Sequence, residues 1–291
     1  MTEKWIPSHA PNGKDIAREY TMRRTLCALG LAAGSLACFD HLTEVQLDCS
    51  DFAGQSGQDC EWRGEIAPGN RIEVRGISGD VRASLATGNE VVVSWIKKGV
   101  RNDPAEVTVE VVLHEDGVTI CAIYPDVPGH PHNECLPDGM GNNSVRDNDV
   151  EVTFRVSVPP GVVLYGRTVT GDIAAEGLES DVFVSTITGD VSVSTSGLAT
   201  AASVTGSVLA SIGLPDWDRD LAFCTVTGSV TVEIPAGTNA DVYASAVTGS
   251  VSSDFPLSKN WVGVWRGTIG SGGRKLTAST VTGSVRLRRG G

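Results

Sequence analysis

One short segment of the chain gathers side chains of the kinds that hold transition metals. His130, His132 and Cys135 lie within six residues, and imidazole nitrogens and thiolates are the usual ligands of zinc. The segment is rich in proline and glycine, so it offers no rigid scaffold, and Cys135 cannot ligate a metal if it forms a disulfide. We therefore expect hydrated loop histidines here, with no metal site.

Three aspartates, Asp80, Asp172 and Asp190, each follow a glycine in the same local context. A row of carboxylates can hold calcium. The equivalent positions later in the chain carry serine, however, and the nonapeptide calcium pattern with paired glycines is absent. Because Asp and Ser also stabilise turns through hydrogen bonds to the backbone, we expect turns at these positions and no calcium.

Residues for catalysis are not clustered in this sequence. Hydrolases and lyases need paired carboxylates or a basic group in a cleft, but the acidic residues are scattered, and no Ser-His-Asp order or nucleophile elbow occurs. We expect no enzyme activity, no catalytic residue and no cofactor. Thr-aliphatic-Thr triplets such as 225–227 resemble the outward rows of ice-binding proteins, but threonine is a common exposed strand residue, and the copies are irregularly spaced.

Three tryptophans are the candidate ligand-binding residues. Trp217 lies in an insertion over 213–220, and Trp261 and Trp265 lie in a longer insertion over 255–274. Insertions in repeat proteins map to loops on one face, which is often the face that binds something. The alternative is that both insertions simply bulge from the surface.

The elements that must position these residues come from a repeated five-residue phrase: aliphatic, Thr, Gly, Asp or Ser, aliphatic. The copies are centred on Gly171, Gly189, Gly206, Gly228, Gly249 and Gly283, with an early variant at Gly79. From Gly171 on, these glycines are 18, 17, 22, 21 and 34 residues apart. A period of roughly 20 residues with β-rich content is typical of a solenoid, in which each repeat forms one coil.

Each copy of the phrase is interpreted as two short strands that meet at a glycine corner, because apolar residues alternate on both sides. The aliphatic residues two positions before the glycine, such as Val226, and two positions after it, such as Val230, are expected to stack into a narrow core. Cys224, four positions before the glycine, is expected to be a buried thiol. Thr225 is expected to point outward.

The N-terminus has the features of a leader. Arg23-Arg24 precedes a short apolar run, which is typical of a secretory signal, and Met22 is an alternative start. Cys38 follows Gly-Ser-Leu-Ala, which resembles a bacterial lipobox apart from Ser35, so Cys38 is the candidate lipidation site. Plain cleavage nearby and an unprocessed membrane anchor are the alternatives. Elsewhere no apolar run is long enough to span a membrane.

Charge and cysteine content agree with export. The formal charge is −12, and it falls to −14 without residues 1–37, which carry five basic and three acidic residues. Such a chain is not expected to bind nucleic acid or anionic lipid. In a secreted protein, two local cysteine pairs favour disulfides between Cys121 and Cys135 and between Cys49 and Cys60, although the other two connectivities of four cysteines stay open.

These signals divide the chain into three parts: a leader over 1–38, a tether with a disulfide loop over 39–63, and an all-β solenoid domain over 64–291. Within the last part, 64–160 is irregular and 161–291 is regular. The order of its motifs resembles the bacterial "putative adhesin" family, from Ile77-Ser78-Gly79-Asp80-Val81, through 120–125 and 158–162, to the Thr-Gly ladder and 269–273.

This resemblance implies an exported, envelope-associated β-solenoid with no family catalytic residues to carry over. We expect the solenoid to be a single right-handed domain that follows an N-terminal signal helix. We expect a structural or adhesin-like interaction module on the bacterial envelope, in the periplasm or on the outer surface, that binds an envelope protein or a glycan. Contact with the membrane is expected only through the leader or a lipid anchor. The alternative function is a carbohydrate-binding or carbohydrate-active solenoid that uses the three tryptophans.

Overall fold

The computed structural model describes residues 47–51, 58–139, 141–261 and 263–290, with the backbone alone over 47–51 and 58–59. The expected leader, the alternative start at Met22 and the candidate lipidation site Cys38 lie outside these residues. The described part is all-β, with two single-turn 3-10 helices, η1 (Pro104–Glu106) and η2 (Pro137–Gly139). None of its helices is long and apolar enough to cross a membrane.

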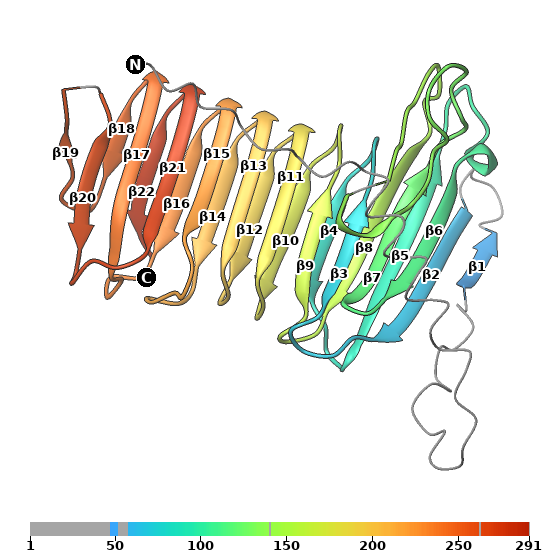
Figure 1. The fold of residues 1–291 in the computed structure, drawn as a ribbon, viewed down its shortest axis with the longest axis horizontal. Helices are drawn as coiled ribbons and strands as arrows, with labels where there is room; N and C mark the ends of the chain where they lie inside the picture. The colour runs from blue at the N-terminus through green and yellow to red at the C-terminus, as the bar shows by residue number, and fades with distance from the viewer. Residues whose placement is uncertain (1–46, 52–57, 140, 262, 291) are drawn as a thin grey trace, which may run out of the picture. The chain divides into compact units, whose positions relative to one another are not determined.

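The strands form two large mixed sheets of 11 strands each (Figure 1). Sheet A contains, in spatial order, β1 (Leu47–Asp51), β2 (Gln58–Glu65), β5 (Glu90–Lys98), β8 (Glu151–Val158), β4 (Val81–Leu85), β10 (Ile173–Leu178), β12 (Val191–Thr195), β14 (Val208–Ile212), β16 (Val230–Ile234), β22 (Val285–Arg289) and β18 (Val251–Ser253). Sheet B contains β19 (Ser258–Lys259), β20 (Trp265–Ile269), β17 (Ala240–Thr248), β21 (Lys275–Thr282), β15 (Leu221–Thr227), β13 (Ala199–Thr205), β11 (Val182–Thr188), β9 (Val163–Arg167), β3 (Arg71–Arg75), β7 (Gly117–Ile123) and β6 (Thr108–His114).

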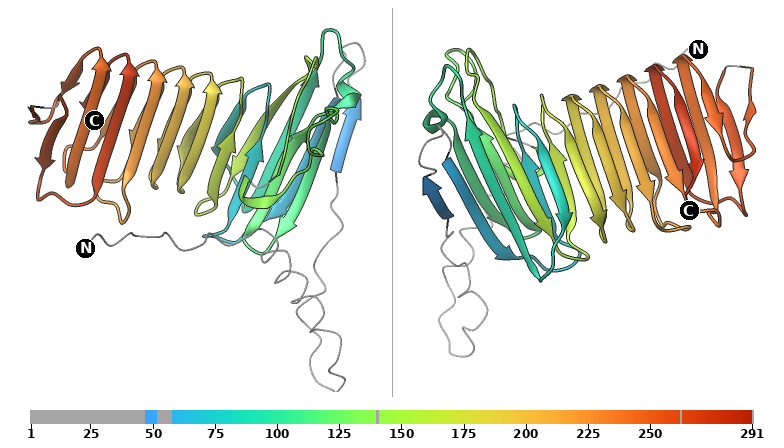
Figure 2. Two further views of the ribbon diagram at one scale, coloured as in Figure 1. Left: turned by 45° about the horizontal axis from the view of Figure 1, so that its top comes forward. Right: turned by 180° about the vertical axis from the view of Figure 1, so that it is seen from behind.

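Parallel and antiparallel pairing are separated along each sheet. Strands that flank the repeated phrase pair in parallel with their counterparts in the neighbouring phrase, as in β11 with β13 and β12 with β14. Antiparallel pairs are confined to the ends, where β2, β5 and β8 extend sheet A and β6 and β20 extend sheet B. The further views of Figure 2 show the two sheets stacked face to face where the strands of the repeated phrase pair in parallel.

The last copy of the phrase is out of sequence order in space. Strand β21 pairs with β15 on one side and with β17 on the other, and β22 lies between β16 and β18. The chain therefore places the copy at Gly283 between the copies at Gly228 and Gly249. The 34-residue interval before Gly283 holds the segment that passes around the end of sheet B and returns.

The core lies between the two sheets. The prediction of which residues face it is right for the strand that follows each corner glycine and wrong for the strand that precedes it. Val230 is fully buried, but Val226 is 45% exposed, whereas Thr225 is only 5% exposed. The expected inward position of Val226 and outward position of Thr225 are wrong. The reason is that the glycine corner interrupts the alternation, so that Thr225 and Val230 both face the core.

The sequence of the strand that precedes each glycine indicates which of its residues face the core. In β15 the large apolar residues Leu221 and Phe223 are buried, and Thr225 continues their alternation. Cys224 lies between buried residues and is exposed, so the expected buried thiol is also wrong. Partial burial against its neighbours raises the pKa of the Cys224 thiol, which lowers the fraction of reactive thiolate.

The longer insertion covers one end of the core. Phe255 and Ile269 are each 5% exposed, and Leu257 and Trp265 are partly buried and pack against the same core. Strands β19 and β20 from this insertion form an antiparallel extension of sheet B. End repeats of stacked proteins need such a cover, because otherwise their apolar face would meet water.

At the opposite end, Trp62, Trp95 and Phe154 fill the core beneath the antiparallel strands of sheet A. Within the span 39–63 expected to be a tether, residues 58–63 belong to β2, which pairs with β5. Cys60 is disulfide-bonded, and the register of β1 and β2 places the backbone of Cys49 opposite it. The Cys49 side chain lies outside the described atoms, so this pairing stays a prediction.

Candidate functional site

The glycine corners carry a straight line of exposed aliphatic side chains, which we call the aliphatic row. Its members are 38% to 78% exposed, and in spatial order they are Val169, Ile187, Val204, Val226, Val281 and Val247. They make up six of the twelve large apolar side chains exposed in the described part of the chain. Paired strands set neighbouring members about 4.8 Å apart.

A line of buried hydroxyl groups, the hydroxyl ladder, holds these corners in register. At each step the Oγ of a buried Thr or Ser donates to the carbonyl oxygen of the glycine in the neighbouring copy, at 2.7 to 3.0 Å. The donor and acceptor pairs are Thr168 and Gly79, Thr186 and Gly171, Ser203 and Gly189, Thr225 and Gly206, and Thr280 and Gly228. The exposed row is thus fixed from beneath.

Glycine is required at these corners for two reasons. Gly228 has φ +146°, and a Cβ placed there would lie 2.1 Å from the carbonyl oxygen of Gly206. Side chains other than hydrogen are strained at such φ values, and the close approach would also break the hydroxyl ladder. The sequence prediction that glycine forms the corner agrees with this backbone geometry.

The three aspartates line up as predicted from their equivalent positions. Asp80 Oδ1 accepts the backbone N–H of Asp172 at 2.9 Å, and Asp172 Oδ1 accepts that of Asp190 at 2.8 Å. Asp190 Oδ1 in turn accepts the N–H of Ser207 at 2.7 Å. One oxygen of each carboxylate therefore bonds the backbone of the neighbouring corner, so these bonds join successive copies of the phrase, whereas the expected turn bonds would lie within one corner.

A loop over residues 124–149, which we call the flap, lies against the outer face of sheet B. It is fixed by the disulfide between Cys121 and Cys135, whose Cα atoms are 5.7 Å apart, and this prediction is confirmed. Asn133 is only 2% exposed, and its amide donates to the carbonyl oxygens of Tyr124, Pro125 and Ser144. Its Oδ1 accepts the backbone N–H of Ser144.

Buried polar groups tie the flap to β3 and β7. Glu73 is 2% exposed and accepts hydrogen bonds from the Thr119 hydroxyl and from the backbone N–H of Asp138 in the flap, both at 3.2 Å. Arg75 donates to the carbonyl oxygen of Leu136 in the flap at 3.0 Å. Burial lowers the pKa of Arg75, and the positive charge of Arg167 lowers it further.

The hydrogen bonds among His114, Thr119 and Glu73 do not activate the Thr119 hydroxyl as a nucleophile. His114 Nε2 lies 3.1 Å from Thr119 Oγ1, but the Thr119 hydroxyl donates its proton to Glu73, so the imidazole must donate. Burial lowers the pKa of His114, as does the charge of Arg71, in agreement with a neutral ring. Thr119 is fully buried, and the cluster serves to position the flap.

Between the flap and the corners lies an apolar groove of about 640 Å³. Val169, Ile187, Val204 and Val226 of the aliphatic row form one wall. Residues of the flap form the opposite wall, among them Glu134, Gly141 and Asn143. Small side chains on the outer face of sheet B, Ser185, Ala202 and Cys224, form the floor. The row is therefore hollowed out at the end nearest the flap.

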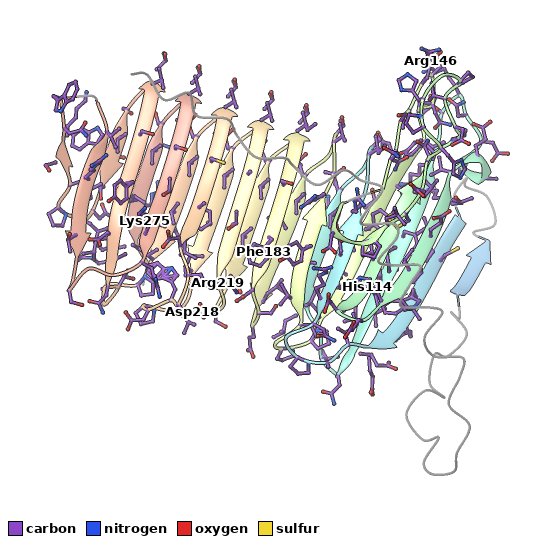
Figure 3. All side chains as sticks on the ribbon, viewed as in Figure 1. His114, Arg146, Phe183, Asp218, Arg219 and Lys275 are labelled. Carbon is purple, nitrogen blue, oxygen red and sulfur yellow. A yellow bond between two sulfur atoms is a disulfide. The ribbon has the colours of Figure 1, made fainter. Side chains whose placement is uncertain are left out.

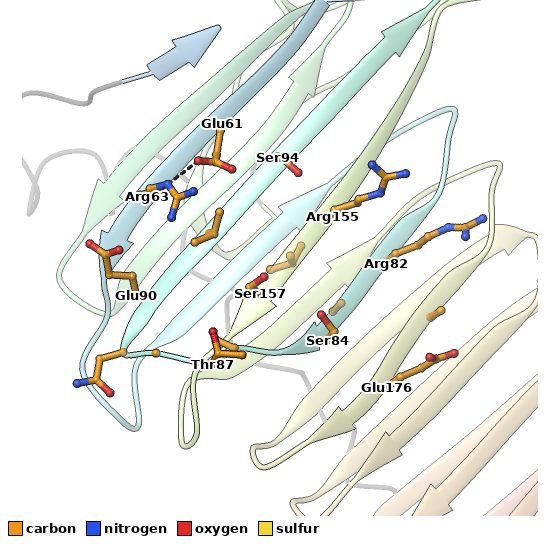
Figure 4. A pocket seen from close by; sticks show the side chains of 17 residues that line it. Glu61, Arg63, Arg82, Ser84, Thr87, Glu90, Ser94, Arg155, Ser157 and Glu176 are labelled. Carbon is orange, nitrogen blue, oxygen red and sulfur yellow. Dashed lines mark hydrogen bonds and ion pairs between the residues drawn. The ribbon is translucent and has the colours of Figure 1, made fainter. Parts of the chain in front are cut away.

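A second, polar groove of about 700 Å³ lies on the outer face of sheet A (Figure 4). It forms where β8 pairs antiparallel with β5 on one side and parallel with β4 on the other. Arg63, Arg82, Arg155, Glu61, Glu90 and Glu176 supply its charges. Hydroxyl and amide groups of Ser84, Ser94, Ser157, Thr87 and Asn89 lie among them.

The charges of the polar groove are unequally paired. Arg63 Nε lies 2.5 Å from Glu61, and Arg82 Nη2 lies 3.0 Å from Asp80. The Arg155 side chain makes no hydrogen bond or ion pair within the described part of the chain. Its backbone is directly beside that of Arg82, because these two residues are partners in the register of β4 and β8. Figure 4 shows both side chains extending in the same direction.

The backbone positions of Glu61, Glu90 and Glu176 in the polar groove are far apart. Strands β2 and β10 are separated by β5, β8 and β4, so four strand spacings set Glu61 about 19 Å from Glu176. Along the sheet, Glu61 pairs with Ser94 and lies four residues from the level of Glu90, which is about 13 Å. Glycosidase carboxylates are roughly 5 to 9.5 Å apart.

The tryptophan candidates are not brought together. Trp217 precedes β15 and Trp261 precedes β20, and β20 runs antiparallel to β17, which is parallel to its neighbours β21 and β15. The two residues therefore lie at opposite ends of the strands. Trp261 is 96% exposed, whereas Trp217 and Trp265 are partly buried and pack against the core. This geometry gives no support to a shared sugar platform.

Arg219 binds the loop that contains Trp217 to sheet B; it is labelled, with its neighbour Asp218, in Figure 3. Arg219 contacts the carboxylate of Asp181 at 2.5 Å, and its guanidinium lies 5.9 Å from the centre of the Phe183 ring. Figure 3 shows Arg219 and Asp218 at one end of the strands and Arg146, in the flap, at the other.

Two of the three candidate metal ligands in the flap, Cys135 and His132, contact other protein groups. Cys135 is in the disulfide, so it is not available as a ligand. His132 Nδ1 lies 2.6 Å from the carboxylate of Asp126, and this hydrogen bond raises the pKa of His132. Groups of three or more His, Cys, Asp or Glu that could hold a metal do not occur in the residues that the structure describes.

Among known proteins, similarity is found to solved structures and not to family models or curated sequences. The chain matches no protein-family model and no curated protein. A solved "putative cell adhesion protein" from Clostridium sporogenes is similar, with 10% identity, a TM-score of 0.46, and coverage of 79% of this chain and 99% of that one. A "putative adhesin" from Bacteroides fragilis has 13% identity, a TM-score of 0.35, and coverage of 79% and 96%.

Proposed function

We propose that this protein is a non-catalytic interaction module of the bacterial envelope, with an adhesin-like role, and that the aliphatic row is its contact surface. The observation that carries the proposal is the row itself: six exposed aliphatic side chains in one line. Contiguous exposed apolar surface marks places where another molecule binds. The hydroxyl ladder beneath keeps the row rigid, so binding does not have to order it first.

A non-catalytic role is supported by the chemistry of both grooves. The apolar groove has an aliphatic wall and a floor of small residues. In the polar groove the Cα positions of Glu61, Glu90 and Glu176 are about 13 Å or more apart on the strand spacings above, which does not favour an acid and base that act on one bond. Among the described residues of the two grooves, no hydrogen bond joins a hydroxyl or thiol side chain to a carboxylate or an imidazole.

Two finer features belong to the same proposal. The parallel pairing of successive phrases in both sheets supports a β-solenoid, in which each phrase turns the corner between the two sheets. The disulfide between Cys121 and Cys135 supports an oxidising location outside the cytoplasm. Export by the leader, with or without lipid on Cys38, is tested by N-terminal mass spectrometry of the protein recovered from its native envelope.

Binding of the mature protein to purified envelope, measured by sedimentation, tests the contact surface. The double variant Val204→Asp and Val226→Asp puts two charges into the row. It should reduce the affinity at least about tenfold, because each desolvated charge is costly in an apolar contact. Circular dichroism and thermal unfolding establish that the variant is folded, as expected for exposed positions.

Trp261→Ala is the matched control, because Trp261 is the most exposed aromatic side chain in the described residues and lies outside the row. It should leave envelope binding unchanged. Equal binding by the double aspartate variant and the unmodified protein would show that the row is not the contact surface. A loss in Trp261→Ala alone would move the function to the longer insertion.

A further inference from the structure

We propose that the polar groove on sheet A binds an acidic sugar, with Arg155 and Arg82 holding its anionic group. This site is separate from the aliphatic row and does not depend on the function proposed for it. The argument rests on two guanidinium groups that the fold places side by side, and on the polar side chains that surround them.

The first step is the position of the two arginines. Arg155 and Arg82 are register partners on adjacent parallel strands, so their Cα atoms are about 4.8 Å apart and their side chains leave the same face. Like charges directly opposite each other destabilise a sheet. Asp80 compensates Arg82 at 3.0 Å, but Arg155 has no such partner within the described residues.

The second step is the space around them. Ser94 is the register partner of Arg155 on the other side, in β5, and Ala174 is the partner of Arg82 in β10. Both are small, so the two guanidinium groups stand above their neighbours with open space on either side. A planar carboxylate or a phosphate placed between them would receive N–H donors from both, which is the geometry in which arginine binds oxyanions best.

The third step is the rest of the groove, which is larger than one ion. Its volume of about 700 Å³ would hold two or three sugar rings. Ser84, Ser157 and Thr87 offer hydroxyl groups, and Glu90 and Glu176 offer acceptors for the hydroxyl groups of a ligand. The glutamates also repel a second anionic group, so the acidic unit is directed to the arginine end. These are the features expected for a polyhydroxyl ligand with one acidic group.

The probe is a three-residue oligogalacturonate in which one residue keeps a free carboxylate and the other two are methyl-esterified, because it combines both features, and binding is measured by titration calorimetry at low salt. The unmodified protein should bind it, and Arg155→Gln should weaken binding at least about tenfold. Arg155→Lys should bind between the two, because lysine keeps the charge but loses the fork of donors. Added salt should weaken the binding of the unmodified protein.

Arg286→Gln is the matched control. Arg286 is exposed on the outer face of the same sheet and makes no ion pair within the described residues, but β22 lies five strands from β4, about 24 Å away. This variant should bind like the unmodified protein. Equal losses in Arg155→Gln and Arg286→Gln would mean attraction by net charge alone and would overturn the site.

Two further arms distinguish the ligand classes. Fully methyl-esterified oligogalacturonate, which lacks the charge, should bind at least about tenfold more weakly. Inorganic phosphate should compete only weakly, and competition equal to that of the trisaccharide would reduce the site to an anion site without sugar recognition, which overturns the proposal. Absence of oligogalacturonate binding also overturns it, and leaves the aliphatic row and its envelope assay unaffected.

Discussion

The side chains of Thr225 and Val226 have nearly the same shape but opposite roles, because one faces the core and the other faces water. Thr225 donates to the carbonyl oxygen of Gly206 at 2.7 Å, whereas Val226 is 45% exposed in the aliphatic row. The pair therefore offers a test in which shape is held constant and only the hydroxyl group moves.

Thr225→Val should lower the free energy of unfolding by about 1 to 3 kcal/mol, because it leaves a buried carbonyl without its donor. Val226→Thr should change it by less than about 0.5 kcal/mol, as for other exposed positions. Urea unfolding of the two variants measures both effects. If Val226→Thr were the more harmful change, the orientation of the whole corner would be wrong.

The hydroxyl ladder lacks its last step, where Ala246 stands in place of Thr or Ser. Its register partner in β21 is Thr280, and a hydroxyl at position 246 would reach the carbonyl oxygen of Gly283 by the geometry of the other steps. Ala246→Thr should therefore raise the free energy of unfolding by about 1 kcal/mol, with a higher thermal midpoint. A decrease would mean that the half-buried site has no room for the side chain.

At the scale of elements, the flap is held by more than its disulfide. Without the bridge, the chain-entropy model predicts a loss of about 3 kcal/mol in unfolding free energy, yet the hydrogen bonds of Asn133 and Glu73 remain. The double variant Cys121→Ser and Cys135→Ser should keep the flap closed. Asn133→Ala should open it, because one buried and two partly buried carbonyl oxygens lose their donor.

Hydrogen exchange of the backbone N–H of Asp138, which Glu73 accepts at 3.2 Å without any part of Asn133, distinguishes these cases. Exchange should stay slow in the double serine variant and become fast in Asn133→Ala. The opposite order would show that the disulfide alone holds the flap, as the proline-rich sequence of the loop suggests.

Sequence patterns were sufficient where a residue's neighbours along the chain determine its role. The corner glycines, the row of aspartates and the Cys121–Cys135 bridge follow from local spacing, and the structure contains all three. The phase of the strand before each glycine was predicted wrongly, because the alternation was carried through the corner. The buried Leu221 and Phe223 show where it should have restarted.

Other parts of the site could not be predicted from local sequence. Arg82 and Arg155 meet only because β4 pairs with β8, and nothing in either segment specifies that pairing. Asn133 looks like one more polar loop residue, although its amide organises the flap. The longer insertion was expected to expose its tryptophans, but its apolar residues cover the core, because the copy at Gly249, the outermost in space, has no further copy beside it to do so.

At the scale of the whole molecule, the end cover should matter more than any exposed aromatic side chain. Phe255 and Ile269 close the core at the end next to β17 and β18. Ile269→Asp should lower the free energy of unfolding by more than about 3 kcal/mol, since it buries a charge without a partner. It should also promote association, because uncovered strand edges pair with other chains.

Thermal unfolding and size-exclusion chromatography measure these two effects, with Trp261→Ala as the reference for an exposed position in the same insertion. The reference should unfold within about 0.5 kcal/mol of the unmodified protein. A monomeric and stable Ile269→Asp variant would mean that the insertion merely lies against the surface.

The spatial order of the last strands also constrains how the protein is made. Ribosomes release β17 before β21, although β17 pairs in parallel with β21 and with no earlier strand. Until the final residues emerge, β15 and β17 are two open edges facing the same gap. A message truncated at codon 275 would omit only 17 of 291 residues, but its product would have no parallel partner for either edge. Loss of residues 275–291 therefore removes the copy that lies between those at Gly228 and Gly249, and newly made chains stay exposed to proteases and to each other until this segment has emerged.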